Sequence, residues 1–118
     1  MEKEKIELLN SIGVDVDDVM ERFLNSDEFY FKCLQKFEND MNYKLMIEGI
    51  KRRDGRQIFE ASHALKGVAG NLGFGKLFAD LVPFVNGFRD GAYSYSDENY
   101  QSIQKDYNEI LEVIDKLV

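Results

Sequence analysis

Apolar side chains recur at intervals of three and four residues along almost the whole chain. This is the period of one face of an α-helix, whereas a half-buried strand alternates apolar and polar residues. No run alternates for long, and no Asn-Gly turn joins two apolar strands. The pattern therefore predicts an all-α fold. The clearest stripes are formed by Phe29, Cys33, Leu34 and Phe37, and by Tyr100, Ile103, Tyr107, Ile110, Leu111 and Ile114.

Residues that favour helix termini divide the first half of the chain into helices. A short helix is expected over about residues 3–11, and Asp15 is a suitable N-cap for the next one. Ser26 or Asp27 caps a third helix, whose acidic first turn suits the helix dipole. We expect its apolar stripe to continue with little break through Met41, Leu45, Met46 and Ile50.

The second half of the chain is expected to hold longer helices. Asp54 caps a helix that carries the only histidine, His63, and that ends near the sequence GNLG. The next helix begins near Phe74 and is kinked by Pro83, because proline lacks an N–H donor and clashes with the preceding turn. Ser96 caps the last helix. These elements predict an antiparallel four-helix bundle with one or two short additional N-terminal helices.

The composition limits the classes of function. A chain of 118 residues fits one domain, residues 1–118, with enough apolar surface to bury a core. The single cysteine, Cys33, cannot form an internal disulfide, and one cysteine with one histidine gives no zinc framework, so no metal site is expected. The N-terminus lacks the apolar core of a signal peptide, and no apolar run is long enough to cross a membrane. We therefore expect a cytoplasmic protein.

The charge is unevenly distributed. A net charge of −7 makes the chain a poor ligand for nucleic acid or an anionic membrane. Residues 51–76, however, contain six basic and two acidic residues, so this segment is +4 while the remainder is −11. His63 lies inside this basic segment. The segment is either a solvated helix face whose charges cluster by chance or the surroundings of a site for an anionic group.

On a helical wheel, His63 lies opposite the apolar face of its helix. Gly67, Gly70 and Arg56 fall within about 40° of His63, and Lys66 falls within about 60°. The wheel therefore predicts an exposed imidazole rather than a core histidine. The apolar face is formed by Ile58, Ala61, Leu65, Val68 and Leu72.

Two glycines on the same face as the histidine need an explanation, because together they cost the helix on the order of 1–2 kcal/mol. Side chains lean toward the helix N-terminus, so a side chain one turn after His63 would overhang its ring, and glycine removes that overhang. Lys66 adds a cation beside the ring. The combination predicts an exposed nucleophilic imidazole that a phosphoryl group can approach, and an idle surface histidine is the alternative.

The segment HALKG at residues 63–67, followed by Gly70 and by Leu72-Gly73, resembles the motif of histidine-containing phosphotransfer (HPt) domains of two-component phosphorelays. The stretch VDVDDVMERFLNSDEFYFKCLQKFENDM is similar to the helices that precede the motif in that family. The resemblance implies an elongated four-helix bundle with the active histidine exposed midway along one helix.

The resemblance also implies roles for individual residues. His63 would be the phosphoacceptor, Lys66 the residue that stabilises charge, and Gly67 the residue that gives clearance, while Gly70 and Gly73 occupy the small positions that follow. The protein would then carry a phosphoryl group between proteins without an ATP site of its own, and it would not be an enzyme in the sense of a kinase. Its partners would be receiver domains of response regulators and a hybrid sensor histidine kinase. Mg²⁺ is expected on the partner receiver and no cofactor on this chain, which we expect to be a monomer.

The next helix departs from the family pattern near the histidine. Family members often carry glutamine or another polar residue there, whereas the corresponding position here is Val85, followed by Asn86. The acidic residue usual a few positions earlier is replaced by Val82, followed by Pro83. Asn86 supplies the hydrogen bond that orients the imidazole only if Pro83 shifts the register.

Other residues leave alternatives open. Phe59 either packs under the first helix or joins an apolar docking patch around His63, which Ala64 would keep flat on the other side. The sequence GNLGFG ends a helix and lacks the features of a nucleotide-binding loop. Cys33 lies on an apolar stripe, so a thiol pair with His63 is not expected. The competing function is an adaptor that docks receiver domains without phosphotransfer.

Overall fold

The computed structural model describes residues 1–117, so Val118, the last residue of the expected domain, lies outside the description. No strand occurs among the described residues, and the all-α prediction is confirmed. The seven α-helices are α1 (Lys3–Ser11), α2 (Val16–Arg22), α3 (Asp27–Phe37), α4 (Asn42–Arg52), α5 (Gly55–Leu72), α6 (Gly75–Asn86) and α7 (Asp97–Leu117), and a short 3-10 helix, η1, spans Arg89–Gly91.

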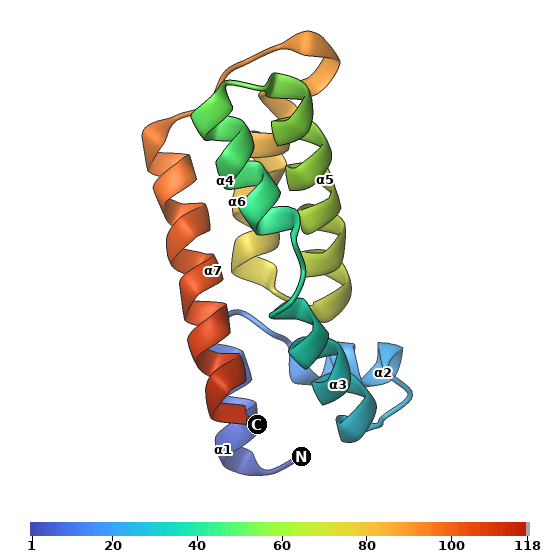
Figure 1. The fold of residues 1–118 in the computed structure, drawn as a ribbon. Helices are drawn as coiled ribbons and strands as arrows, with labels where there is room; N and C mark the ends of the chain where they lie inside the picture. Colours follow the sequence, from blue (N-terminus) through green and yellow to red (C-terminus); the bar gives the residue numbers. More distant parts are fainter. Residues whose placement is uncertain (118) are drawn as a thin grey trace.

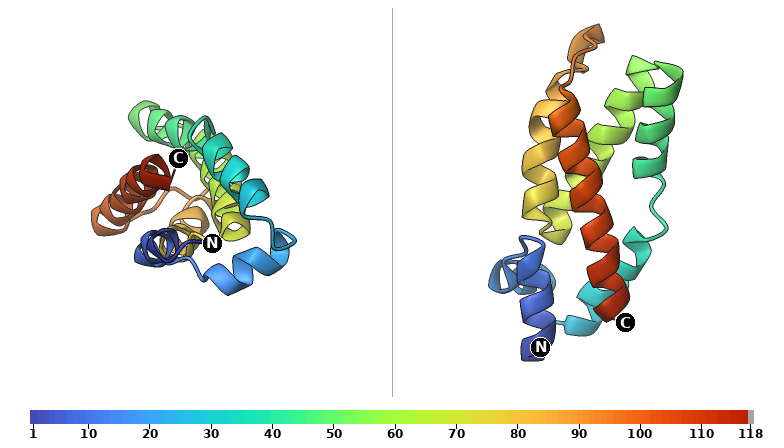
Figure 2. Two further views of the ribbon diagram at one scale, coloured as in Figure 1. Left: turned by 90° about the horizontal axis from the view of Figure 1, so that it is seen from below. Right: turned by 90° about the vertical axis from the view of Figure 1, so that its left-hand side faces the viewer.

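The helices form an elongated bundle with principal extents of 44 × 23 × 21 Å. Helices α4, α5 and α6 lie at one end, and α1, α2 and α3 lie at the other (Figure 1). Helix α7 spans both groups, as the right-hand view of Figure 2 also shows. Successive helices from α4 to α7 run in alternating directions. Within residues 1–117, no helix combines the length and the apolar character needed to cross a membrane.

The buried face of α5 is the one that the helical wheel predicts. Ile58, Leu65 and Leu72 are buried, and Val68 is half-buried at the edge of the same stripe. Each fully buried side chain of this kind stabilises the fold by about 1.5–3 kcal/mol. The same core also contains Leu34, Met46, Leu77, Leu81, Phe84, Ile103, Ile110 and Ile114, from α3, α4, α6 and α7.

The predicted N-caps are confirmed. The side chains of Asp15, Ser26 and Asp54 each accept a hydrogen bond from a backbone N–H in the first turn of their helices. Ser96 does the same for α7, where its Oγ accepts from the N–H of Asn99 at 3.0 Å. These bonds satisfy donors that the start of a helix leaves without a partner.

The structure corrects one local expectation, on α3 and α4, and adds detail to a second, on α6. The stripe that was expected to continue with little break from α3 into α4 is interrupted by a turn over residues 38–41. There the Asp40 carboxylate accepts from the N–H of Asn42 at 2.9 Å, because a short acidic side chain competes with the helix for the backbone donor. Helix α6 continues through Pro83, one turn before its end.

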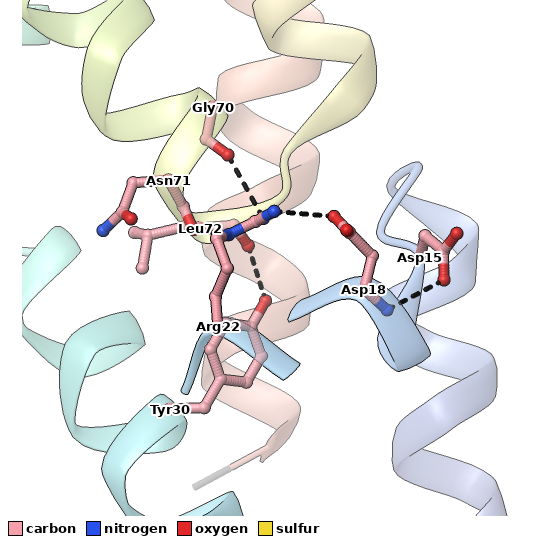
Figure 3. Close-up of polar contacts among 7 residues, drawn as sticks. All are labelled: Asp15, Asp18, Arg22, Tyr30, Gly70, Asn71 and Leu72. Atoms are coloured by element: carbon pink, nitrogen blue, oxygen red, sulfur yellow. Dashed lines mark hydrogen bonds and ion pairs between the residues drawn. The ribbon is translucent and has the colours of Figure 1, made fainter. Parts of the chain in front are cut away.

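The C-terminal end of α5 is held by side chains from α2 and α3 (Figure 3). The Tyr30 hydroxyl donates to the Leu72 carbonyl at 2.7 Å, and the Arg22 guanidinium donates to the carbonyls of Asn71 and Gly70 at 3.3 and 3.4 Å. Arg22 also forms an ion pair with Asp18 at 2.7 Å. The last carbonyls of a helix have no partner within the helix and carry partial negative charge, so this arrangement fixes one end of the helix that bears His63.

Candidate functional site

His63 projects into solvent from the middle of α5. Its side chain is exposed, and it forms no hydrogen bond or ion pair with residues 1–117. The hydroxyl of the preceding residue, Ser62, is buried and donates to the carbonyl of Ile58 at 2.6 Å, so it does not engage the imidazole. The prediction of an exposed imidazole is confirmed, and both nitrogens of the ring are left for another molecule.

The cation beside the ring also has no acidic partner among the described residues. Lys66 is half-buried, one turn after His63, and takes part in none of the ion pairs of residues 1–117. The nearest carboxylate in sequence, Glu60, pairs with Arg56 at 3.0 Å on the preceding turn. The positive charge of Lys66 therefore stays available to an anion that approaches the imidazole.

The three glycines that follow His63 serve different purposes. A β-carbon added at Gly67 would meet no atom within 4 Å, so nothing in the chain itself requires glycine there. A β-carbon at Gly70 would lie 3.2 Å from the ring of Phe78, which packs against that bare backbone. Gly73 ends α5 in the left-handed conformation with φ of +83°, where glycine is the favoured residue. Only Gly67 leaves open space beside the histidine.

Two contacts fix the register of α5 against the segment that follows it. Gly70 lies under Phe78, and Phe59 lies under Arg89, where the guanidinium carbon is 5.3 Å from the ring centroid. Because α6 runs antiparallel to α5, counting outward along both helices from the contact between Gly70 and Phe78 puts Val82 at the level of Lys66 and Val85 at the level of His63.

This register creates an apolar surface beside the imidazole. Phe78 and Val82 are 39% and 37% exposed, whereas Val85 is fully buried. Exposed apolar groups that adjoin a reactive side chain are typical of a protein-binding surface. We call the surface formed by His63, Lys66, Gly67, Phe78 and Val82 the docking face. Ala64 is exposed next to His63 on the other side of the helix.

The structure shows which side chains Phe59 and Asn86 contact, which the sequence did not specify. The ring of Phe59 is nearly parallel to the imidazole, with 16° between the planes and 5.6 Å between the centroids. Phe59 thus joins the surroundings of His63, and its side chain also packs against the edge of the core. The Asn86 side chain accepts a hydrogen bond from Arg89 Nε at 3.3 Å and makes none to His63.

From the sequence, Arg89 and Phe78 were not assigned to the surroundings of His63, and Val82 was noted only because it replaces the acidic residue usual in the family. The register that placed Val85 opposite His63 did not extend to Arg89, which lies beyond the end of α6 in η1. Asn86 was singled out as a partner of the imidazole because it is adjacent to the facing position. In the structure the Asn86 side chain instead accepts a hydrogen bond from Arg89, whose guanidinium lies over the Phe59 ring.

A second polar feature lies between α6 and α7. Asp106 is buried, and its Oδ2 atom has no hydrogen-bond partner. Burial, the adjacent carboxyl of Asp80 and the charge of Glu109 raise the pKa of Asp106 to about 7, against a smaller opposite effect of Lys76. Within residues 1–117, no group of three or more histidine, cysteine or acidic side chains is placed to hold a metal ion.

Comparisons with protein-family models, with curated proteins and with solved structures give no match to this chain. The function is therefore inferred from the geometry of the site and from the motif around His63.

Proposed function

We propose that this protein is a phosphorelay intermediate of the HPt type. It accepts a phosphoryl group on His63 from the aspartyl phosphate of a receiver domain and passes it to another receiver. The observation that carries this proposal is the combination of an exposed, unbonded imidazole with an unpaired Lys66 and open space at Gly67. An ordinary surface histidine would need neither the cation nor the glycine.

The arrangement of the helices supports the proposal. Helices α4 to α7 alternate in direction along the bundle, and α5 presents His63 midway along its length with its apolar stripe in the core. This alternation supports the four-helix bundle that the resemblance to HPt domains implies, although three short helices, α1, α2 and α3, precede α4 where one or two were expected. The motif and the fold are separate observations that point to the same class.

The transfer forms one bond and breaks one bond. A nitrogen of the neutral imidazole, expected to be Nε2, attacks the phosphorus in line with the aspartyl oxygen. The N–P bond forms as the P–O bond breaks, the electron pair leaves with the receiver's carboxylate, and the proton on the other ring nitrogen stays in place. The reverse reaction on a second receiver returns the imidazole. Negative charge spreads over three oxygens in the transition state, so nearby cations and correct placement matter most.

Lys66 and the docking face supply what this chemistry needs from the chain. The Lys66 ammonium lies on the turn after His63, where it can offset charge on the equatorial oxygens. Phe78 and Val82 offer an apolar surface on which a receiver can rest, and Gly67 lets it approach closely. Mg²⁺ would arrive with the receiver rather than with this chain. We propose receiver domains and a hybrid sensor histidine kinase as partners, with this protein acting as a cytoplasmic monomer.

The test is phosphotransfer from a receiver domain charged with radioactive phosphate. Wild-type protein should acquire label that is labile in acid and stable in base, as expected of phosphohistidine, and His63→Gln should acquire none. A second charged receiver domain, from a different response regulator, guards against a mismatched partner. The proposal fails if wild type and His63→Gln are labelled equally, or if none of a broad panel of charged receivers labels wild type.

One observation favours the alternative, an adaptor that docks receivers without transfer. The position level with His63 on α6 is the buried, apolar Val85, and no hydrogen bond holds the imidazole. An adaptor would bind a receiver with an affinity that does not change in His63→Gln, and it would acquire no label. Measuring binding and label on the same two proteins distinguishes the two functions.

A further inference from the structure

Three side chains lie in series on one side of the imidazole. Phe59 is one turn before His63 on α5, and the two rings are nearly parallel, with centroids 5.6 Å apart. The Arg89 guanidinium lies over the Phe59 ring, 5.3 Å from its centroid. Arg89 is in turn held by Asn86, whose Oδ1 accepts from Nε at 3.3 Å. The series thus runs from the end of α6 back to the proposed phosphoacceptor.

An exposed histidine needs some group to fix its ring. The outer torsion of a histidine side chain has a broad, roughly two-fold energy profile, so an imidazole without contacts samples many orientations. Neither a hydrogen bond from the described residues nor a polar side chain at position 85 restrains this ring. Residues four apart on a helix lie side by side, so the Phe59 ring is placed to restrain the imidazole of His63.

Phe59 is itself well held. Its side chain is half-buried and packs against the edge of the core. A cation over an aromatic face adds a favourable electrostatic interaction, and Arg89 provides that cation. A ring fixed by these two contacts presents a stable surface to its neighbour, which a flexible aliphatic chain would not.

We propose that Phe59 is a positioning residue that holds the imidazole of His63 in one orientation, and that Arg89 holds Phe59 in place. The consequence for phosphoryl transfer rests on the proposed function, but the orientation of the ring does not. In-line attack requires the reacting nitrogen to point at the phosphorus. Small misplacements of a reacting group cost up to about a hundredfold in rate, and we expect a loss of about tenfold without Phe59.

The single histidine makes the orientation measurable by NMR, because the imidazole signals of the spectrum belong to His63 alone. Wild-type protein should show nuclear Overhauser contacts between the Phe59 ring and the imidazole protons. In Phe59→Leu the imidazole resonances should shift, and the carbon relaxation of the ring should report greater motion. Phe59→Tyr, which keeps the aromatic ring, should restore wild-type behaviour. Arg89→Gln should give an intermediate effect.

The rate is measured on the same variants with a small phosphodonor, phosphoramidate, and with a charged receiver. Phe59→Leu should slow both reactions about tenfold, and Phe59→Tyr should restore them. If Phe59→Leu slows transfer from the receiver but not from phosphoramidate, Phe59 acts in docking, and the positioning role is wrong. Because Arg89 is exposed, Arg89→Gln tests the proposal even if Phe59→Leu unfolds.

The two proposals fail differently. If imidazole resonances and ring motion are the same in Phe59→Leu as in wild type, the positioning role is wrong, whatever the transfer assays show. If wild type shows the ring contacts but acquires no phosphate from any donor, the proposed function is wrong and the orientation of His63 by Phe59 stands.

Discussion

The C-terminal end of α5 and its middle, from His63 to Gly67, differ in how their polar groups are bonded. At the C-terminal end, the carbonyls of Gly70, Asn71 and Leu72 accept hydrogen bonds from Arg22 and Tyr30 (Figure 3). Around the middle of the helix, His63 and Lys66 have no hydrogen-bond or ion-pair partner among the described residues, and the space at Gly67 is open. Among the described residues, the same helix is therefore bonded to α2 and α3 at its C-terminal end and has polar groups without partners near its middle.

The difference separates residues that hold the fold from residues that serve another molecule. Polar groups bonded within the chain contribute to stability, and their removal leaves an unsatisfied partner behind. Polar groups without partners contribute little to folding when they are exposed, so their substitution should change function alone. The predictions below test this difference on α5 and extend it to Asp106 on α7.

The largest expected effect is at Tyr30, which is fully buried and donates to Leu72. Tyr30→Ala should lower the free energy of unfolding by about 3–5 kcal/mol, because it removes a large buried ring and leaves a cavity. His63→Gln should change it by no more than about 0.5 kcal/mol. Urea denaturation followed by circular dichroism measures both. Equal losses of stability would show that the C-terminal end and the middle of α5 do not differ.

Asp106 is a third case, because its carboxyl is buried and the Oδ2 atom has no hydrogen-bond partner among the described residues. Its pKa is raised to about 7, so between about pH 4 and 7 the folded protein holds a proton that the unfolded chain has released. Proton uptake by the folded state means that the free energy of unfolding falls as pH rises through this window, and it stays low above pH 7.

Asp106→Asn removes the ionisable group and should therefore stabilise the protein at pH 8, by about 1–3 kcal/mol, with little effect near pH 4. Urea denaturation at several pH values measures the slope. Asp115→Asn, at an exposed position of the same helix, is the matched control and should leave the slope unchanged. The same slope in Asp106→Asn as in wild type would contradict the assignment to this carboxyl.

The sequence predicted much of the fold and the centre of the site, for identifiable reasons. Helical periodicity and caps such as Asp54 are local properties, and so is the position of His63 opposite its apolar stripe. What it did not predict depends on contacts between elements. The placement of Arg89 over the Phe59 ring, for example, requires the arrangement of η1 against α5. The turn between α3 and α4 is a separate, local case, in which the Asp40 side chain accepts from the N–H of Asn42.

Lys66 should affect transfer without affecting folding. Lys66→Ala should slow transfer from a charged receiver about tenfold, which corresponds to roughly 1.4 kcal/mol of barrier height, because it removes a cation beside the transferred group. Lys66→Arg should retain most of the rate. Lys105→Ala, an exposed lysine on α7, is the control for net charge. If Lys105→Ala slows transfer as much as Lys66→Ala, the effect is one of overall charge and not of this site.

Substitution of Gly67 should give a small gain in stability, and it separates stability from function most clearly. A β-carbon there meets nothing within 4 Å, so Gly67→Ala should stabilise the protein by about 0.5–1 kcal/mol through the lower helix propensity of glycine. At Gly70 the same substitution brings a β-carbon within 3.2 Å of Phe78, so part or all of that gain should be lost. Thermal denaturation of the two alanine variants compares them directly.

Substitutions at Gly67 should lower the rate of transfer, in contrast to the gain in stability expected for Gly67→Ala. A glutamine at this position would extend over the imidazole, because side chains lean toward the helix N-terminus, and transfer from a receiver should slow while the fold is retained. Gly67→Ala should fall between wild type and Gly67→Gln. A more stable protein that transfers more slowly would show that the missing side chain serves the visiting receiver, whereas unchanged transfer in Gly67→Gln would leave the glycine without that explanation.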